Sequence, residues 1–81
     1  MIKVTVYTNP SCVQCDQTKR YLDRVGIPYD VVDLSTNEEA AEMVIAKGHK
    51  SAPVVITDKE EWSGFRLTKL ADLASRFTSE G

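Results

Sequence analysis

The chain contains few of the residues that mark several large classes of protein. Its 81 residues include two cysteines, one histidine and one tryptophan. Two cysteines are too few for the disulfide framework that stabilises small secreted domains. Ten basic residues against twelve acidic ones give a formal net charge of −2, whereas binding to nucleic acid without regard to sequence needs a clustered basic face. We therefore expect neither a disulfide scaffold nor a nucleic-acid-binding protein.

Long hydrophobic runs are also missing. No apolar run approaches the ~20 residues that cross a bilayer, and the first residues, MIKVTVYT, alternate in polarity and then enter a turn, unlike a secretory signal. Hydrophobic residues make up 42% of the chain and charged residues 27%, which is ordinary for a soluble globular protein. We expect one domain, residues 1–81, located in the cytoplasm and without a membrane partner.

The first part of the chain predicts a strand followed by a helix. Apolar and polar side chains alternate over residues 2–7, as in a half-buried strand. The turn TNPS follows. Ser11 and Gln14 have the Ser-x-x-Gln spacing of a capping box, so we expect a helix that begins beside Cys12 and ends at Gly26.

The remainder of the chain predicts five more elements. They are a strand at residues 29–34, a helix within residues 35–50 that Ser35 or Thr36 opens and Gly48 closes, a strand at residues 54–57, a short edge strand that starts at Trp62, and a last helix. The apolar face of that last helix is expected to consist of Leu67, Leu70, Ala71, Ala74 and Phe77.

The predicted order of elements is β-α-β-α-β-β-α. The first β-α-β unit must be parallel, and the two strands joined by TDKEE should form an antiparallel hairpin. With a C-x-x-C motif at the first strand-to-helix turn, this order resembles the thioredoxin fold in its minimal, glutaredoxin-like form. We therefore expect an α/β fold with a four-stranded mixed sheet flanked by three helices.

Both cysteines belong to the sequence CVQC at the start of the first predicted helix. The helix dipole and the unpaired backbone N–H groups there favour an anion, so we expect the pKa of Cys12 to be lowered and its thiolate to be the nucleophile. Cys15 lies one helical turn further on, where it can attack a mixed disulfide and release a reduced partner. The motif therefore predicts a redox pair.

Two other uses of the cysteines remain open. A structural zinc site normally needs four ligands, and His49 is the only histidine that could join the two thiols. A zinc ion or an iron–sulfur cluster shared between two chains would need a second copy. A purely structural disulfide would close a very short loop and would be reduced in the cytosol. We therefore predict no metal ligands in this chain.

Three motifs resemble the NrdH-type redoxins: CVQC followed by TKR, PVV at residues 53–55, and WSGFR at residues 62–66. The resemblance extends over nearly the whole chain, and WSGFR is its most specific part. It implies a dithiol carrier that binds no cofactor itself. Such a carrier takes electrons from NADPH through a flavin-containing thioredoxin reductase and reduces class Ib ribonucleotide reductase. We expect a monomer.

The same resemblance implies roles for residues around the cysteines. In this fold Pro53 is cis and lies against the cysteine pair, and the preceding Ala52 offers its backbone groups to an extended peptide. Trp62 is either an exposed aromatic that contacts a partner or the apolar residue of an edge strand. The residues expected to contact a substrate or partner are Tyr7, Asn9, Val13, Gln14, Ala52, Pro53, Trp62, Ser63, Gly64, Phe65 and Arg66.

Glutathione is the alternative electron donor, and two features argue against it. Glutaredoxins typically have a lysine three residues before the first cysteine, where this chain has Asn9. They also have a glycine pair and an acidic residue in the region that reads WSGFRLT here. The NrdH-type redoxins usually continue WSGFR with proline, and Leu67 replaces it. Two alternatives to the predicted carrier remain: a glutathione-dependent glutaredoxin and, less favoured, a metal-binding module.

Overall fold

The computed structural model describes residues 3–80. The expected strand position at Ile2 lies outside the described residues. The elements are β1 (Thr5–Thr8), α1 (Val13–Val25), β2 (Asp30–Asp33), α2 (Glu38–Ala46), β3 (Val54–Ile56), β4 (Glu61–Ser63) and α3 (Leu67–Glu80). The predicted order β-α-β-α-β-β-α is confirmed. β2 and β3 are shorter than predicted, β1 ends one residue later than predicted, and β4 begins one residue before Trp62. No helix among the described residues is long and apolar enough to span a bilayer.

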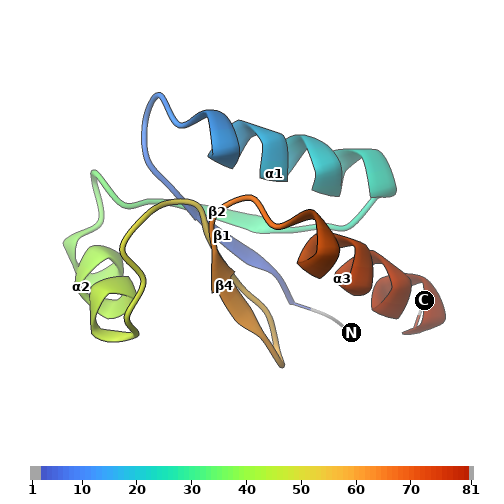
Figure 1. The fold of residues 1–81 in the computed structure, drawn as a ribbon. Helices are drawn as coiled ribbons and strands as arrows, with labels where there is room; N and C mark the ends of the chain where they lie inside the picture. Colours follow the sequence, from blue (N-terminus) through green and yellow to red (C-terminus); the bar gives the residue numbers. More distant parts are fainter. Residues whose placement is uncertain (1–2, 81) are drawn as a thin grey trace.

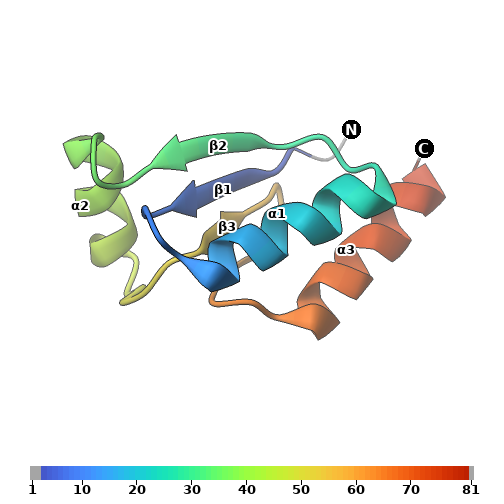
Figure 2. The ribbon, with the colours of Figure 1, turned by 90° about the horizontal axis from the view of Figure 1, so that it is seen from above.

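The four strands form one mixed sheet in the order β2-β1-β3-β4. β1 pairs in parallel with β2, with Thr5 opposite Asp30, and antiparallel with β3. β3 and β4 form the predicted antiparallel hairpin, with Val55 opposite Trp62. Helices α1 and α3 lie side by side over one face of the sheet, and α2 lies apart from them near the carboxyl end of β1 (Figures 1 and 2). This is the predicted four-stranded α/β fold with three helices.

The core lies between the sheet and the pair α1 and α3. Val4 and Val6 point into it, which confirms the alternation read from the sequence. The largest buried side chains on the helices are Leu22, Leu70 and Leu73, each 0% exposed. β1 is paired with β2 on one side and with β3 on the other, which fixes the position of its carboxyl end and hence of the loop that carries the cysteines.

The N-cap of α1 is Cys12, so the predicted capping box at Ser11 and Gln14 is wrong. The Cys12 sulfur accepts a hydrogen bond from the Cys15 N–H at 3.2 Å, which is the bond that a capping serine would make. Ser11 instead has a positive φ of 57° in the turn before the helix. Gly26 ends the helix as predicted, with a φ of 79° and an N–H that donates to Asp23 O at 3.3 Å.

The start of α2 also differs from the prediction. Asn37 is the N-cap, and its Oδ1 accepts a hydrogen bond from Ala40 N at 3.0 Å. Ser35 does not cap the helix, because its N–H and its hydroxyl both donate to Asp33 Oδ1, at 2.8 and 2.6 Å. Thr36 likewise donates its hydroxyl to Asp33 O at 3.3 Å. Both residues therefore form a turn after β2 and do not cap the helix.

Helix α3 buries a slightly different face from the one predicted. Leu70 is fully buried, and Ala74 and Phe77 pack against the core, as expected. Leu67 is 55% exposed, however, so its assignment to the buried face is wrong. Ala71 is exposed as well, and Leu73 takes its place in the core. Leu67 is the first residue of the helix, and the buried face is centred on Leu70 and Leu73.

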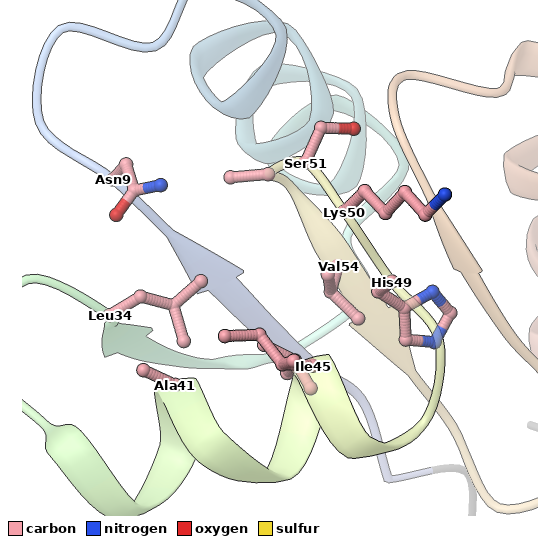
Figure 3. A pocket seen from close by; sticks show the side chains of 10 residues that line it. Asn9, Leu34, Ala41, Ile45, His49, Lys50, Ser51 and Val54 are labelled. Atoms are coloured by element: carbon pink, nitrogen blue, oxygen red, sulfur yellow. The ribbon is translucent and has the colours of Figure 1, made fainter.

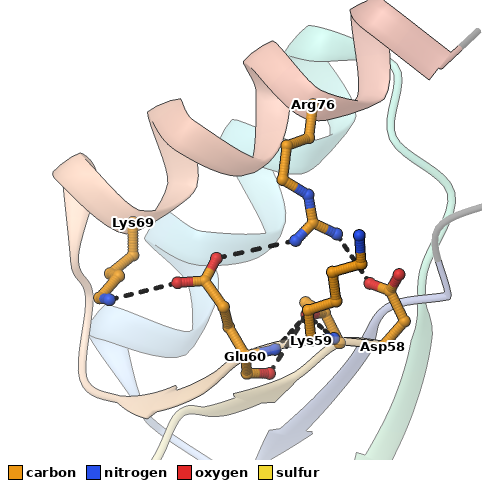
Figure 4. Close-up of polar contacts among 6 residues, drawn as sticks. Asp58, Lys59, Glu60, Lys69 and Arg76 are labelled. Atoms are coloured by element: carbon orange, nitrogen blue, oxygen red, sulfur yellow. Dashed lines mark hydrogen bonds and ion pairs between the residues drawn. The ribbon is translucent and has the colours of Figure 1, made fainter.

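Ion pairs join α3 to the turn of the β3–β4 hairpin (Figure 4). Arg76 Nη2 lies 2.7 Å from Asp58 Oδ1, and Arg76 Nη1 lies 3.8 Å from Glu60 Oε2. Lys69 Nζ lies 3.3 Å from the other oxygen of the Glu60 carboxylate. These contacts fix the hairpin relative to α3 at the end of the domain away from the cysteines.

Candidate redox site

Cys12 and Cys15 form a disulfide at the amino end of α1. Their Cα atoms are 5.2 Å apart. Cys15 is 1% exposed, whereas Cys12 is half-buried. A partner can therefore reach the Cys12 sulfur but not the Cys15 sulfur, which is the asymmetry expected of a nucleophile and a resolving thiol.

The backbone around Cys12 suits a thiolate. The sulfur accepts the Cys15 N–H at 3.2 Å and lies at the positive end of a thirteen-residue helix. The Cys12 carbonyl accepts the Asp16 N–H at 3.2 Å, which is the first backbone hydrogen bond of the helix. The sequence predicted that Cys12 lies at the start of this helix, although it assigned the cap to the wrong residue.

The loop before β3 lies against the cysteine pair. The Ala52–Pro53 peptide bond is cis, as the resemblance implied. The carbonyl oxygen of Ala52 lies 3.8 Å from Cys12 Sγ, and Pro53 is fully buried. Pro53 O also accepts the Gly64 N–H at 2.8 Å, which joins this loop to the segment after β4.

The segment Trp62–Arg66 reaches the site through its backbone. Phe65 N donates to Gln14 Oε1 at 3.0 Å, so a residue between the two cysteines is bonded to a residue fifty-one positions later. Gly64 has a φ of 84°, and a Cβ there would lie 3.4 Å from the same Gln14 oxygen. A side chain at residue 64 would thus strain the turn and crowd this bond. The expectation that WSGFR lies beside the cysteines is confirmed.

The remaining predicted site residues differ in accessibility. Val13 is 71% exposed beside Cys12. Asn9 is exposed at the end of β1, and Tyr7 is half-buried opposite Val54. Arg66 is exposed and donates from Nε to Ser63 O at 3.3 Å.

Trp62 does not form part of the accessible site. It is 4% exposed and belongs to the core cluster with Val55, Leu70 and Leu73. The expected contact between its side chain and a partner is therefore wrong, and the alternative, an apolar residue of the edge strand, is confirmed. The cause is the strand period, since the middle residue of β4 points to the face that α3 covers.

A groove of about 240 Å³ adjoins the site on the side of α2. Figure 3 shows Leu34, Ala41 and Ile45 turned toward one another beneath the end of β1, with the loop of Lys50 and Ser51 above them. Ile45 is 69% exposed. Asn9 and Ala52 also line this groove, so it connects directly with the loop that contacts Cys12. The sequence analysis did not predict that Leu34 and Ile45 line a groove. The position of the apolar Ile45 near the end of the second predicted helix could have indicated it.

Within residues 3–80, no cluster of three or more histidine, cysteine, aspartate or glutamate side chains is placed to hold a metal ion. His49 lies away from the cysteines, with its Nε2 atom 2.6 Å from Glu61 Oε2. The same glutamate lies 3.2 Å from Lys47 Nζ. The hydrogen bonds from His49 and then Lys47 lower the pKa of Glu61 below its ordinary value.

Comparison with known proteins agrees with this geometry. The family model of glutaredoxin matches residues 4–62. The glutaredoxin-like protein NrdH of Escherichia coli K12 is 40% identical over 65 residues, which cover 80% of each chain. NrdH of Lactococcus lactis IL1403 is 39% identical over 71 residues, covering 88% of this chain and 99% of that one.

The chain belongs to the glutaredoxin family, as a glutaredoxin-like protein of the NrdH type. A solved structure of the Escherichia coli NrdH-redoxin superposes on it with a TM-score of 0.86 at 38% identity, covering 88% of this chain and 93% of that one. The membership and the Cys12–Cys15 disulfide identify this NrdH-type redoxin as a thiol–disulfide oxidoreductase. Its resemblance to that group, first recognised from CVQC, PVV and WSGFR, is confirmed.

Proposed function

We propose that this redoxin carries electrons in the cytoplasm from NADPH, through a flavin-containing thioredoxin reductase, to class Ib ribonucleotide reductase. The observation that supports this most strongly is the site built from CVQC and WSGFR, in which Phe65 N is bonded to Gln14. This pairing of segments is the distinctive part of the NrdH-type resemblance. In addition, the NrdH-redoxin of Escherichia coli is described as having a thioredoxin-like activity profile.

The reaction needs only the two thiols of this chain. The Cys12 thiolate attacks one sulfur of the target disulfide, forming a mixed disulfide and releasing the other target sulfur as a thiolate. Cys15, as a thiolate, then attacks Cys12 Sγ and displaces the first target sulfur. The target gains two electrons and two protons, and Cys12–Cys15 becomes the disulfide. The reductase returns two electrons and two protons from NADPH to this disulfide.

The surroundings of the pair would place the target chain. Ala52, next to the cis proline, presents its backbone beside Cys12, where an extended segment can lie. Val13 offers an exposed apolar side chain on the other side of the nucleophile. We assign Tyr7, Asn9 and the backbone of residues 63–66 to the rest of the rim, because Asn9 lines the groove beside Ala52 and Phe65 N donates to Gln14. Pro53 acts by holding Ala52 in position.

The residues around the site argue against glutathione as the donor. Glutathione carries carboxylates and needs cationic groups that are free to bind them. Asn9 stands where glutaredoxins place a lysine. Lys19 lies 3.7 Å from Asp16, and Arg66 bonds a backbone oxygen of its own loop. Lys50 is exposed beside Asn9 and forms no ion pair among residues 3–80, so the argument against glutathione rests on Asn9 and on the segment WSGFRLT.

The proposal is tested by reconstituting class Ib ribonucleotide reductase with NADPH, thioredoxin reductase and this protein. We expect deoxyribonucleotide formation that depends on all three components and disappears with the Cys15→Ser variant. Val31→Ala, an exposed change on β2 remote from the cysteines, serves as the matched control and should retain activity. Failure of the wild-type protein to support turnover, when dithiothreitol supports it in the same mixture, would contradict the assignment of the acceptor.

A further inference from the structure

A second groove, of about 290 Å³, runs along α1 on the side of α3. Its lining residues are Gln17, Arg20, Tyr21, Arg24, Phe65 and Leu67, and we refer to it as the arginine groove. The four residues from α1 are spaced by three and four, so they share one face of that helix. Figure 2 shows this helix beside the beginning of α3, where Leu67 lies.

The arginine groove begins at the redox site. Phe65, which lines it, donates its backbone N–H to Gln14 between the two cysteines. From there the groove follows α1 away from Cys12 toward its carboxyl end. A polypeptide whose disulfide lies at Cys12 can therefore continue into the groove without leaving the surface.

The two arginines of the groove have no acidic partner among residues 3–80. Both are exposed, and neither forms an ion pair within this part of the chain. The acidic residues of the same helix are engaged elsewhere. Asp16 lies 3.7 Å from Lys19, and Asp23 Oδ1 accepts the Tyr29 hydroxyl at 2.9 Å. The groove is thus a local positive site on a chain whose net charge is −2.

We propose that the arginine groove binds an acidic, extended segment of the protein whose disulfide this redoxin reduces. The inference rests on the proposed carrier function and adds the chemistry of the partner. Charge complementarity supplies the argument: two guanidinium groups on one helix face can each bind a carboxylate. Phe65 is half-buried and Leu67 is 55% exposed, so the opposite wall can take an apolar side chain between the two acidic ones.

The geometry sets the spacing of the acidic residues. Arg20 and Arg24 follow Cys12 by eight and twelve residues, which corresponds to about 12 and 18 Å along the helix. An extended chain advances about 3.3 Å per residue, so the two carboxylates belong roughly four and six positions from the partner's disulfide cysteine. A small anion has no two carboxylates to match this spacing, whereas a protein segment with two carboxylates at this spacing can bind both arginines.

The test uses two synthetic disulfide peptides that differ only in charge. One carries glutamate four and six positions from the disulfide on both sides, and the other carries glutamine at those positions. Pre-reduced redoxin is mixed with each peptide at low ionic strength, and the second-order rate of peptide reduction is measured. We expect the wild-type protein to reduce the glutamate peptide about tenfold faster, with a preference that declines as salt is added.

Charge reversal decides the origin of this preference. In the Arg20→Glu, Arg24→Glu variant we expect the ratio of the two rates to fall to one or below. The Lys3→Glu, Lys59→Glu variant has the same net charge but alters residues at the other end of the sheet, and it should keep the wild-type ratio. Because each ratio is measured within one protein, a general loss of activity does not affect it. Arg20→Gln, Arg24→Gln should give an intermediate ratio.

Three results would overturn the inference. The first is a ratio of the two peptide reduction rates that stays at the wild-type value after reversal of both arginines. The second is an equal fall of this ratio in the Lys3→Glu, Lys59→Glu control. The third is loss of the preference in inorganic phosphate at constant ionic strength, which would indicate a site for small anions. Failure to reduce either peptide would instead contradict the carrier function, whereas equal reduction of both by the wild-type protein contradicts the docking groove alone.

Discussion

Cys12 and Cys15 differ in their surroundings, and the two roles that we propose for them rest on this difference. The Cys12 sulfur is accessible, accepts a backbone N–H and lies beside Ala52 O. Cys15 is 1% exposed and reaches a partner only through Cys12. In the proposed mechanism, position in the helix therefore distinguishes two chemically identical side chains: Cys12 meets the partner and Cys15 releases it.

Single substitutions of these cysteines should have opposite outcomes. Cys15→Ser removes the resolving thiol, so we expect a mixed disulfide between Cys12 and an oxidised target to accumulate. Cys12→Ser removes the accessible thiol and should form no adduct. Mass spectrometry after mixing with a disulfide-bonded target, under non-reducing conditions, measures both. An adduct with the Cys12→Ser variant alone would reverse the roles assigned to the two residues.

Gln14 is the residue that joins the cysteine motif to WSGFR. Gln14→Ala removes the acceptor of the Phe65 N–H, which we expect to cost about 1 kcal/mol in the free energy of unfolding. For a domain of this size that corresponds to a fall in Tm of roughly 4–8 °C. Gln17→Ala, on the same helix and without a hydrogen bond from its side chain among the described residues, is the matched control. Equal Tm values for the two variants would show that the bond contributes nothing to stability.

The turn end of the β3–β4 hairpin has polar contacts with two other parts of the chain. At the turn, Arg76 of α3 lies between Asp58 and Glu60 (Figure 4). Beside the turn, Glu61, the first residue of β4, contacts His49 and Lys47, which follow α2. The hairpin therefore carries WSGFR on a strand whose position depends on two helices.

The contacts of Arg76 should make a measurable, salt-dependent contribution to stability. Its side chain is only 25% exposed and contacts two carboxylates, so we expect Arg76→Met to lower the free energy of unfolding by about 1 kcal/mol at low salt. The loss should shrink as salt screens the pairs. Urea unfolding at two salt concentrations measures it, with the exposed Lys59→Met as control. Identical midpoints for Arg76→Met and wild type at low salt would contradict this role.

The contacts of Glu61 predict a dependence of stability on acid. Its pKa is lowered by the hydrogen bonds from His49 and Lys47, so its folded pKa lies below its unfolded one. The carboxylate therefore stabilises the fold above the unfolded pKa, and this contribution is lost as the pH falls through the folded pKa. Between about pH 7 and pH 3.5 we expect the unfolding free energy of wild type to fall more steeply than that of Glu61→Gln.

The control for this pH dependence is Glu42→Gln, which changes an exposed glutamate of α2 that forms no ion pair among the described residues. Its stability should follow the wild-type curve in acid. Parallel curves for wild type and Glu61→Gln would mean that the contacts with His49 and Lys47 do not contribute to the fold.

For the domain as a whole, the order of elements could be predicted because each strand and helix has its own period and its own terminating residue. Gly26 and Gly48, both with positive φ, end or follow the two helices where the sequence suggested. The helix starts were harder to predict, because Ser11, Ser35 and Asn37 are all acceptable caps locally. Tertiary contacts decide among them, as the bonds of Ser35 to Asp33 illustrate.

In the redox site, too, some features could be predicted from the sequence and others could not. The cysteine pair and the cis proline could be predicted from local motifs and their resemblance to a family. The burial of Trp62 could not, because it depends on which face of β4 is covered by α3. The arginine groove was also invisible in the sequence, since Phe65 and Arg20 are brought together only by the packing of α3 against α1.

The choice of electron donor is the most direct test of the function proposed for the domain. The reduced protein is supplied with an insulin disulfide acceptor, and NADPH oxidation is followed first with thioredoxin reductase and then with glutathione and glutathione reductase. We expect rapid oxidation with thioredoxin reductase and only the background rate with glutathione, because Asn9 replaces the lysine that glutaredoxins typically have at this position. Efficient turnover with the glutathione system and none with thioredoxin reductase would contradict the proposal and identify a glutathione-dependent glutaredoxin.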